Sequence, residues 1–273
     1  MMARVAVFFR AAALWALLLA LFPSPRASSA HAGETLVFAL CYHSFLGSAR
    51  YAGDVSPAEL AGQLDELSSR GFRFVTLSDI DAGRLRGTRN VLVTIDDGNA
   101  SVYDAYFSVF RPRGIRPLLC IYPGVIGRKS YSLTWERLAR LVQDGCEVAS
   151  HGYYHLGLTS ALFEEDRQAF EHEIFGSRKK LEERLGVRVR SFAYPSGVHS
   201  PQARRLLAEA GYSYAFTILW GPVRLPGDLD GSRLTLPRYM IYRGNWPVVL
   251  GAVSKRASSA SAQPAASQTP GGR

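Results

Sequence analysis

The chain has 273 residues, a formal net charge of +9, 47% hydrophobic residues and three cysteines. This length allows one large domain with a real hydrophobic core, and so few cysteines exclude a fold that depends on disulfide bonds. Most of the excess positive charge lies in the two ends, and no basic stripe crosses the body, so we expect no nucleic-acid partner.

The first 32 residues have the order of a secretory signal peptide. Arg4 and Arg10 precede an apolar run at residues 11–22, and small residues surround His31. The apolar run is short for a membrane span. We therefore expect residues 1–32 to direct export to the periplasm or the extracellular space and to be removed, with an uncleaved N-terminal anchor as the alternative.

Strand-like and helix-like stretches alternate along the body. The expected strands cover residues 35–42, 72–76, 91–95, 117–122, 146–150, 187–194 and 214–218. The expected helices begin at Ser56-Pro57 and at Thr134 and also cover residues 102–111, 163–185 and 201–210, while residues 234–241 and 248–253 close the folded part. Residues 254–273 are mostly Ser, Ala, Gln, Pro and Gly, which predicts a disordered tail after a domain at residues 33–253.

This alternation predicts an α/β fold with a parallel sheet and right-handed crossovers. Seven or eight such units in one domain favour a single (β/α) barrel of about seven strands over an open sheet. In such a barrel the functional residues gather at the C-terminal rim of the strands. Cys41, Cys120 and Cys146 lie in apolar strand-like runs, and we interpret them as small buried hydrophobic residues.

The strand at residues 91–95 ends in Asp96, Asp97 and Gly98. Adjacent residues of an extended chain point to opposite sides, so the two carboxylates are expected to have different roles. A plain Asp-Gly turn is the alternative, because such turns are common after strands.

Three more polar clusters follow strand ends, at His43, at His151 and at Tyr194-Pro195. His151 and His155 stand in an i, i+4 relation, which places both imidazoles on one face of a helix or turn. Two such histidines and one carboxylate form a three-ligand metal site, as in catalytic zinc sites or in the facial triad of iron enzymes. The second carboxylate can then act as a general base on a water whose pKa the metal lowers.

These residues resemble the polysaccharide deacetylases of carbohydrate esterase family 4. The first family motif, T-[F/I]-D-D-G, is matched by residues 94–98, and the second, H-[S/T]-x-x-H, by residues 151–155 with Gly152 at the hydroxyl position. The third, R-x-F-R-x-P-Y-G, is met only in part by residues 190–197. The resemblance spans residues 35–253.

The resemblance implies a distorted (β/α) barrel that removes N-acetyl groups from a glycan. It implies that Asp96 is the base and that Asp97, His151 and His155 hold the metal, with zinc as the default and cobalt, nickel or iron as alternatives. The backbone N–H of Ser196, at the tyrosine position of the third motif, would stabilise the oxyanion.

Two departures from the family pattern need substitutes. The arginine that braces the catalytic Asp is replaced by Ala193, and Arg238 is the candidate substitute, with a plain surface arginine as the alternative. No histidine follows His199, although the family usually takes its general acid from a late L-x-H motif. His43 is the expected acid, which resembles the circularly permuted poly-N-acetylglucosamine deacetylases of biofilms.

The expected substrate is therefore a β-linked N-acetylglucosamine polysaccharide, with poly-β-1,6-N-acetylglucosamine favoured over chitin oligomers and peptidoglycan. Tyr194 is a candidate for substrate contact, although aromatic residues near strand ends often serve packing. The rival functions are a glycoside hydrolase, which needs two carboxylates about 5–10 Å apart across a bond, and a glycan-binding module derived from a deacetylase. A monomer is assumed.

Overall fold

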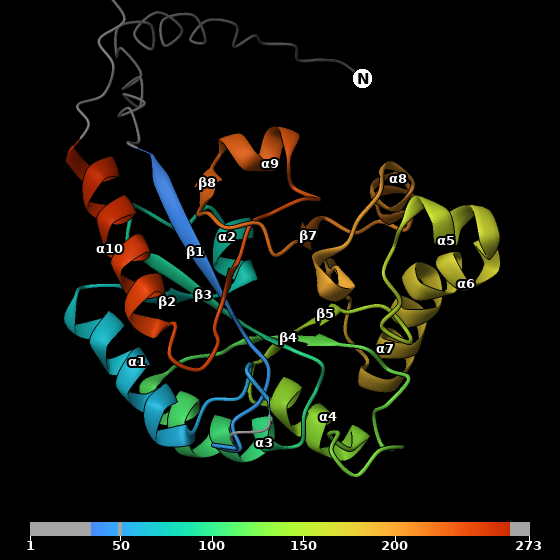
Figure 1. Cartoon of the computed structure of the whole chain (residues 1–273), viewed down its shortest axis with the longest axis horizontal. Helices are drawn as coiled ribbons and strands as arrows, with labels where there is room; N and C mark the ends of the chain where they lie inside the picture. The colour runs from blue at the N-terminus through green and yellow to red at the C-terminus, as the bar shows by residue number, and fades with distance from the viewer. Residues whose placement is uncertain (1–33, 49–50, 263–273) are drawn as a thin grey trace, which may run out of the picture. The chain divides into compact units, whose positions relative to one another are not determined.

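The computed structural model describes residues 34–48 and 51–262, which lie within one compact unit, Gly33–Arg273. The expected leader at residues 1–32 lies outside the described residues. The central feature is a curled sheet of nine strands (Figure 1). Seven of them follow the order β7-β6-β5-β4-β3-β1-β8, and β2 and β9 pair beside β3 and β1. Its strands are β1 (Thr35–Tyr42), β2 (Arg73–Val75), β3 (Asn90–Asp96), β4 (Leu118–Ile121), β5 (Glu147–Ser150), β6 (Ser191–Ala193), β7 (Tyr214–Phe216), β8 (Val223–Leu225) and β9 (Tyr239–Met240).

Neighbouring strands pair in parallel, except that β8 runs antiparallel to the start of β1. The short strand β2 pairs with the first half of β3, and β9 pairs with the end of β1. The curled parallel sheet confirms the predicted α/β fold with a distorted (β/α) barrel.

Residues 233–240 connect the two edges of the curled sheet. Leu236 forms a parallel bridge with Phe216 of β7, and a few residues later Tyr239 pairs with Leu40 of β1. Because this stretch pairs first with one edge and then with the other, only its last residues form a strand. Arg238 lies between these two points of pairing.

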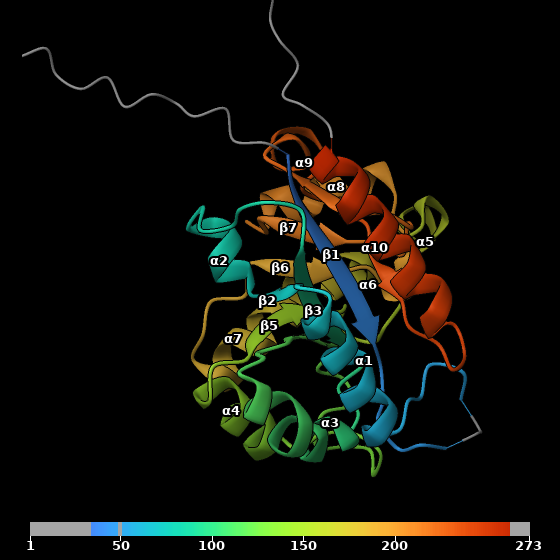
Figure 2. The same cartoon turned by 90° about the vertical axis from the view of Figure 1, so that its left-hand side faces the viewer.

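Side chains alternate between the two faces of the strands. Phe38 and Leu40 of β1 and Val91 of β3 belong to the larger apolar cluster, whereas Val37 and Leu92 belong to a smaller cluster on the other face. Helices cover the larger cluster around the outside of the sheet (Figure 2). These are α1 (Pro57–Ser69), α4 (Trp135–Gln143), α7 (Ser177–Leu185), α8 (Pro201–Glu209) and α10 (Trp246–Ala262).

Two predicted helices are less regular than expected. The helix expected at residues 102–111 begins as α3 (Ser101–Ala105) and continues as the π-helical turn η1 (Tyr106–Phe110) and the 3-10 turn η2 (Arg111–Arg113). The helix expected at residues 163–185 is wrong at its start. Asp166 leaves the helical conformation, ends α5 (Ser160–Glu165) and caps α6 (Arg167–Glu171). From there the chain stays helical through the π-helical turn η3 (His172–Gly176) and α7.

The predicted disorder of residues 254–273 is wrong for residues 254–262, which continue α10. Ala257 is fully buried, and the Thr88 hydroxyl donates a 2.8 Å hydrogen bond to its carbonyl. The Thr88 hydroxyl also lies 2.6 Å from Ser261 Oγ, so the Ser- and Ala-rich end of the helix packs against the residues before β3. Residues 263–273 lie outside the described part of the chain, and none of the described helices is long and apolar enough to cross a membrane.

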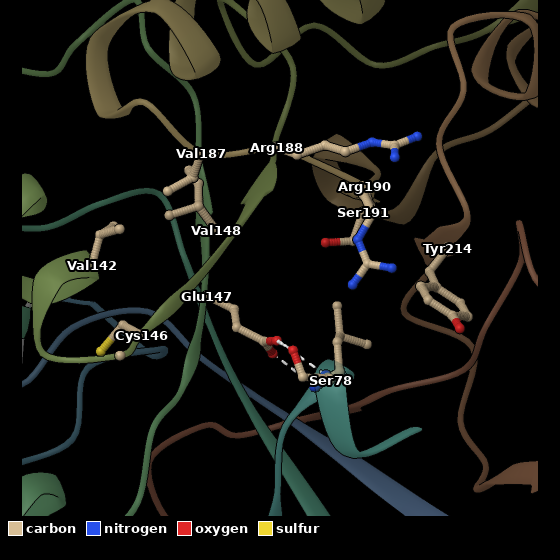
Figure 3. A pocket seen from close by; sticks show the side chains of 12 residues that line it. Ser78, Val142, Cys146, Glu147, Val148, Val187, Arg188, Arg190, Ser191 and Tyr214 are labelled. Atoms are coloured by element: carbon tan, nitrogen blue, oxygen red, sulfur yellow. Dashed lines mark hydrogen bonds between the residues drawn. The ribbon is translucent and has the colours of Figure 1, made fainter. Parts of the chain in front are cut away.

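The short helix α2 (Leu77–Asp81) covers the sheet at the N-terminal ends of β5, β6 and β7. Glu147, the first residue of β5, accepts hydrogen bonds from the amides of Leu77 (2.7 Å) and Ser78 (3.0 Å) (Figure 3). At the other end of α2, Asp81 accepts a hydrogen bond from the Tyr214 hydroxyl and pairs with Arg190. A cavity of about 250 Å³ lies among these residues, at the end of the strands opposite the predicted site.

All three cysteines are buried and free, as predicted. The helix α9 (Gly227–Gly231) follows β8, and the 3-10 turn η4 (Pro195–Gly197) follows β6.

Candidate active site

Side chains of β3 alternate between the two faces of the sheet, which places Asp96 on the inner face. Asp96 is the last residue of the strand and is 2% exposed. Asp97 then turns away with φ of 73°. The expectation that the two carboxylates point to opposite sides is wrong: Asp96 Oδ2 and Asp97 Oδ1 lie 3.7 and 3.6 Å from the same atom, His151 Nε2. The left-handed conformation of Asp97 ends the alternation and brings its carboxylate to the rim.

The loop after β5 carries both histidines. His151 Nε2 and His155 Nε2 each lie 3.6 Å from Asp97 Oδ1. His151 Nδ1 lies 2.8 Å from the carbonyl of Ala193, which fixes the ring and leaves Nε2 facing the carboxylates. Burial lowers the pKa of His151 against the opposing effect of Asp96 and Asp97, so the ring is disposed to be neutral, as a metal ligand must be.

Asp97, His151 and His155 fit a divalent cation. Their ligand atoms all lie within 4.8 Å of one another. Ligands about 2.0–2.1 Å from a tetrahedral metal are about 3.4 Å apart, close to the two 3.6 Å separations measured here. These three residues are the candidate metal ligands.

Arg238 is fully buried and clamps Asp96 from within the barrel. Its Nη1 lies 2.7 Å from Asp96 Oδ1, its Nη2 lies 2.9 Å from Oδ2, and its Nε donates to the carbonyl of Thr217 at 2.9 Å. Burial alone would raise the pKa of Asp96, but the Arg238 guanidinium, together with His151 and His43, outweighs burial and holds that pKa well below the ordinary value. The geometry excludes the alternative of a plain surface arginine.

His43 follows β1 and is 9% exposed. One of its ring nitrogens lies within 4.8 Å of an Asp96 carboxylate oxygen and of Cys41 Sγ. Its Nδ1 is buried and has no hydrogen-bond partner among the described residues, and its ring meets Tyr51 edge to face at 5.8 Å. His199, the next histidine along the chain from the third motif, lies against the buried ring of Tyr194 and is not among the residues that line a cavity with His43.

The Cys41 thiol donates a 3.3 Å hydrogen bond to Asp96 Oδ2. Burial raises the pKa of this thiol, so it stays protonated as a donor. Sequence reasoning missed this contact, although the alternation of β1 places Cys41 on the inner face opposite β3.

Ser196 and Tyr194 flank the third motif. Ser196 adopts φ of 54°, and its amide has no acceptor among the described residues. The side chain of Tyr194 is fully buried and its hydroxyl donates to the carbonyl of Leu234. The ring of Tyr194 therefore cannot stack on a sugar, and the residue supports the site from the core.

The residues described above line one cavity of about 270 Å³. It is lined by every residue that the sequence assigned to the site: His43, Asp96, Asp97, His151, His155, Tyr194, Ser196 and Arg238. Half-exposed Tyr51 and Tyr242 also line it, and sequence reasoning missed both.

Backbone conformation marks the same rim. Among the described residues, the non-glycine positions with positive φ are Asp97, His155 and Ser196. A left-handed conformation costs an ordinary residue roughly 1–2 kcal/mol. Its concentration at one rim indicates a functional site.

Comparisons with known proteins agree with this geometry. A family model described as polysaccharide deacetylase matches residues 84–215. The structure of IcaB from Ammonifex degensii is 33% identical, with a TM-score of 0.71, and the match covers 81% of this chain and 97% of that one. The chain belongs to the polysaccharide deacetylase family.

Two further relatives are more distant. The Streptococcus pyogenes deacetylase PplD, solved in complex with acetate, shares the fold with a TM-score of 0.70 at 18% identity, over 80% of this chain and 98% of that one. YxkH of Bacillus subtilis (strain 168), whose name assigns it provisionally to the polysaccharide deacetylases, is 24% identical over 182 residues. That match covers 65% of this chain and 63% of YxkH.

Proposed function

We propose that the protein is a metal-dependent hydrolase that removes N-acetyl groups from a β-linked N-acetylglucosamine polysaccharide. The observation that carries the proposal is the shared cavity: an Asp-His-His cluster stands beside a buried aspartate that is clamped by an arginine, with a histidine next to that aspartate. Family membership supports the same reaction.

Asp97, His151 and His155 would hold the cation, with zinc favoured and cobalt, nickel or iron as alternatives. When bound, the cation would supply Lewis acidity, lowering the pKa of the attacking water and polarising the acetyl carbonyl. The neutral ring of His151 and the fixed tautomer set by Ala193 favour this role.

The chain's own groups divide the proton transfers. Arg238 keeps Asp96 ionised, so Asp96 Oδ2 can accept a proton from the attacking water. His43, in its protonated form, would give a proton to the departing amine of the sugar. The amide of Ser196 would donate a hydrogen bond to the oxyanion.

The substrate is proposed from the resemblance to the permuted branch and from the cavity. A volume of about 270 Å³ suits one acetamido sugar rather than a long stretch of polymer, since clefts for larger ligands span about 300–1,000 Å³. Tyr51 and Tyr242 line the cavity and would contact the sugar ring. We propose poly-β-1,6-N-acetylglucosamine, acted on by an exported monomer, with chitin oligomers and peptidoglycan as alternatives.

The site geometry does not favour a glycoside hydrolase. That reaction needs two carboxylates that are free to act on either side of one bond. The carboxylates that line this cavity are Asp96, which Arg238 clamps, and Asp97, which lies beside both histidines. A binding module would keep the cavity and bind glycan without turnover.

An acetate-release panel separates these functions. Purified protein loaded with zinc, cobalt, nickel or iron is incubated with poly-β-1,6-N-acetylglucosamine, chitin oligomers and peptidoglycan. We expect acetate from the first polymer, none after chelation, and a loss of at least about 100-fold in Asp96→Asn, which removes the general base. New reducing ends would support a glycoside hydrolase, and binding without either product would support a binding module.

A further inference from the structure

We propose that Glu173 is a positioning residue that holds the loop between the two histidine ligands and thereby sets how tightly the site binds its cation. The inference rests on the proposed metal dependence but concerns a residue outside the cavity. Glu173 belongs to the π-helical turn η3, and its side chain is fully buried.

The carboxylate of Glu173 accepts three backbone hydrogen bonds from the histidine loop. Its Oε2 accepts from the amides of Tyr153 (2.9 Å) and Leu156 (3.1 Å), and its Oε1 accepts from the amide of Tyr154 (2.8 Å). These residues lie between His151 and His155 or directly after them, in a stretch that is neither helix nor strand. Without the carboxylate, three amides of this loop would lose their acceptor.

Gly152 makes the fit specific. A Cβ at Gly152 would lie 2.2 Å from Glu173 Oε2 and 3.2 Å from Pro195 Cγ, and the residue has φ of +75°. The position that carries a hydroxyl residue in the resembled motif therefore has to be glycine here, because the carboxylate occupies its space. The Glu173 carboxylate can keep this position only while residue 152 has no side chain.

The π-helical turn is anchored to the strand that delivers His151. The Ser177 hydroxyl donates to the carbonyls of Glu173 (2.5 Å) and Ile174 (3.1 Å), and its oxygen lies 2.7 Å from Ser150 Oγ at the end of β5. Glu173 is thus fixed relative to both ends of the loop: to β5 through Ser150 and to His155 through its neighbours. Partners that orient metal ligands in this way typically account for 10- to 100-fold in metal affinity.

The test measures metal affinity directly, in the absence of substrate. Glu173→Gln keeps the size of the side chain, but its NH2 group would face an amide that needs an acceptor. By competition with a chromophoric chelator for zinc, we expect the dissociation constant to rise about 10- to 100-fold. At saturating zinc, kcat for acetate release should recover to within about threefold of the wild-type value, because the ligands and Asp96 are intact.

Glu171→Gln is the matched control. Glu171 lies two residues earlier and pairs with Arg167 at the surface. Its replacement should leave zinc affinity unchanged. Wild-type affinity in folded Glu173→Gln, even with reduced stability of the apo-protein, would overturn the inference.

A second pair of variants covers the case in which Glu173→Gln does not fold. Gly152→Ala pushes on the carboxylate and should weaken zinc binding, whereas Gly157→Ala, in the same loop, meets only Val198 at 3.6 Å or more and should not. Equal zinc affinity in these two variants would overturn the inference. Failure of the wild-type protein to bind any of the four metals would instead count against the proposed function itself.

Discussion

At the scale of single residues, the ion pair Asp96–Arg238 places two opposite charges in the interior of the protein. Both side chains are buried, and two parallel hydrogen bonds join them. The free energy lost when one partner is removed comes mainly from the charge left unpaired in the interior. The pair is therefore expected to dominate both the stability of the apo-protein and the ionisation of the proposed base.

Arg238→Gln should destabilise the apo-protein by about 3–5 kcal/mol, measured by urea unfolding at pH 7. Arg111→Gln is the control, because Arg111 pairs with Asp144 at the surface and should change stability by less than about 1 kcal/mol. Combining Arg238→Gln with Asp96→Asn should restore part of the loss, since no unpaired charge then remains. Equal effects of the two arginine substitutions would contradict this assignment.

The same pair sets a direction for pH dependence. The native pKa of Asp96 is lowered, so its ionised form stabilises the fold above the pKa of the unfolded aspartate. That contribution should disappear progressively as the pH falls below about 4. Asp96→Asn should show a shallower decline of the unfolding free energy between pH 5 and about pH 2.5 than wild type. An unchanged pH profile in this variant would show that other carboxylates account for the acid sensitivity.

The sequence predicted most of these residues for a physical reason. Motif spacing identifies Asp97, His151 and His155, because the ligands of one metal ion must lie at fixed distances from one another. Spacing does not reveal the left-handed turn at Asp97, because aspartate adopts both extended and left-handed conformations and the spacing does not choose between them. Glu173 was hidden within a charged stretch that resembles a solvated helix, and the only local sign was Gly152 at the hydroxyl position.

At the scale of elements, helix α2 is held at the N-terminal ends of the strands by two carboxylates, one from β5 and one from its own last residue. Glu147 accepts hydrogen bonds from the first two amides of the helix (Figure 3). Asp81 accepts a hydrogen bond from the Tyr214 hydroxyl and pairs with Arg190. Glu147→Ala should reduce stability by about 1–2 kcal/mol, because the amides of Leu77 and Ser78 lose their acceptor. It should leave kcat unchanged, because α2 lies at the opposite end of the strands from the site. A change in kcat without a change in stability, compared with exposed Glu183→Ala, would contradict this separation.

Helix α10 shows where composition misleads. Its Ser- and Ala-rich end predicted disorder, yet Ala257 is buried and Thr88 binds its carbonyl. A chain that ends at Val253 should unfold several degrees below one that ends at Ala262, measured by thermal unfolding, because a loss of 1 kcal/mol lowers Tm by about 2–4 °C at this size. Equal Tm values for the two chains would mean that the helix end contributes nothing.

At the scale of the whole molecule, the barrel explains how an early histidine and a late arginine meet at one aspartate. Curling of the sheet brings β1, β3 and the connecting residues 233–240 together, so His43, Asp96 and Arg238 converge on one cavity. Alternating strands and helices were sufficient to predict this architecture. The antiparallel pairing of β8 and the two successive pairings of residues 233–240 could not be predicted, because they depend on how the two sheet edges are joined.

The most direct test of the central claim is the dependence of acetate release on bound zinc. Zinc is titrated into metal-free protein in the presence of a β-1,6-linked N-acetylglucosamine oligomer, and acetate is measured at each step. We predict no release without metal, a rate that rises until one zinc per chain is bound, and no rise in Asp97→Ala. Acetate release that does not depend on zinc would contradict the account. So would a zinc-loaded protein that releases no acetate from poly-β-1,6-N-acetylglucosamine, chitin oligomers or peptidoglycan.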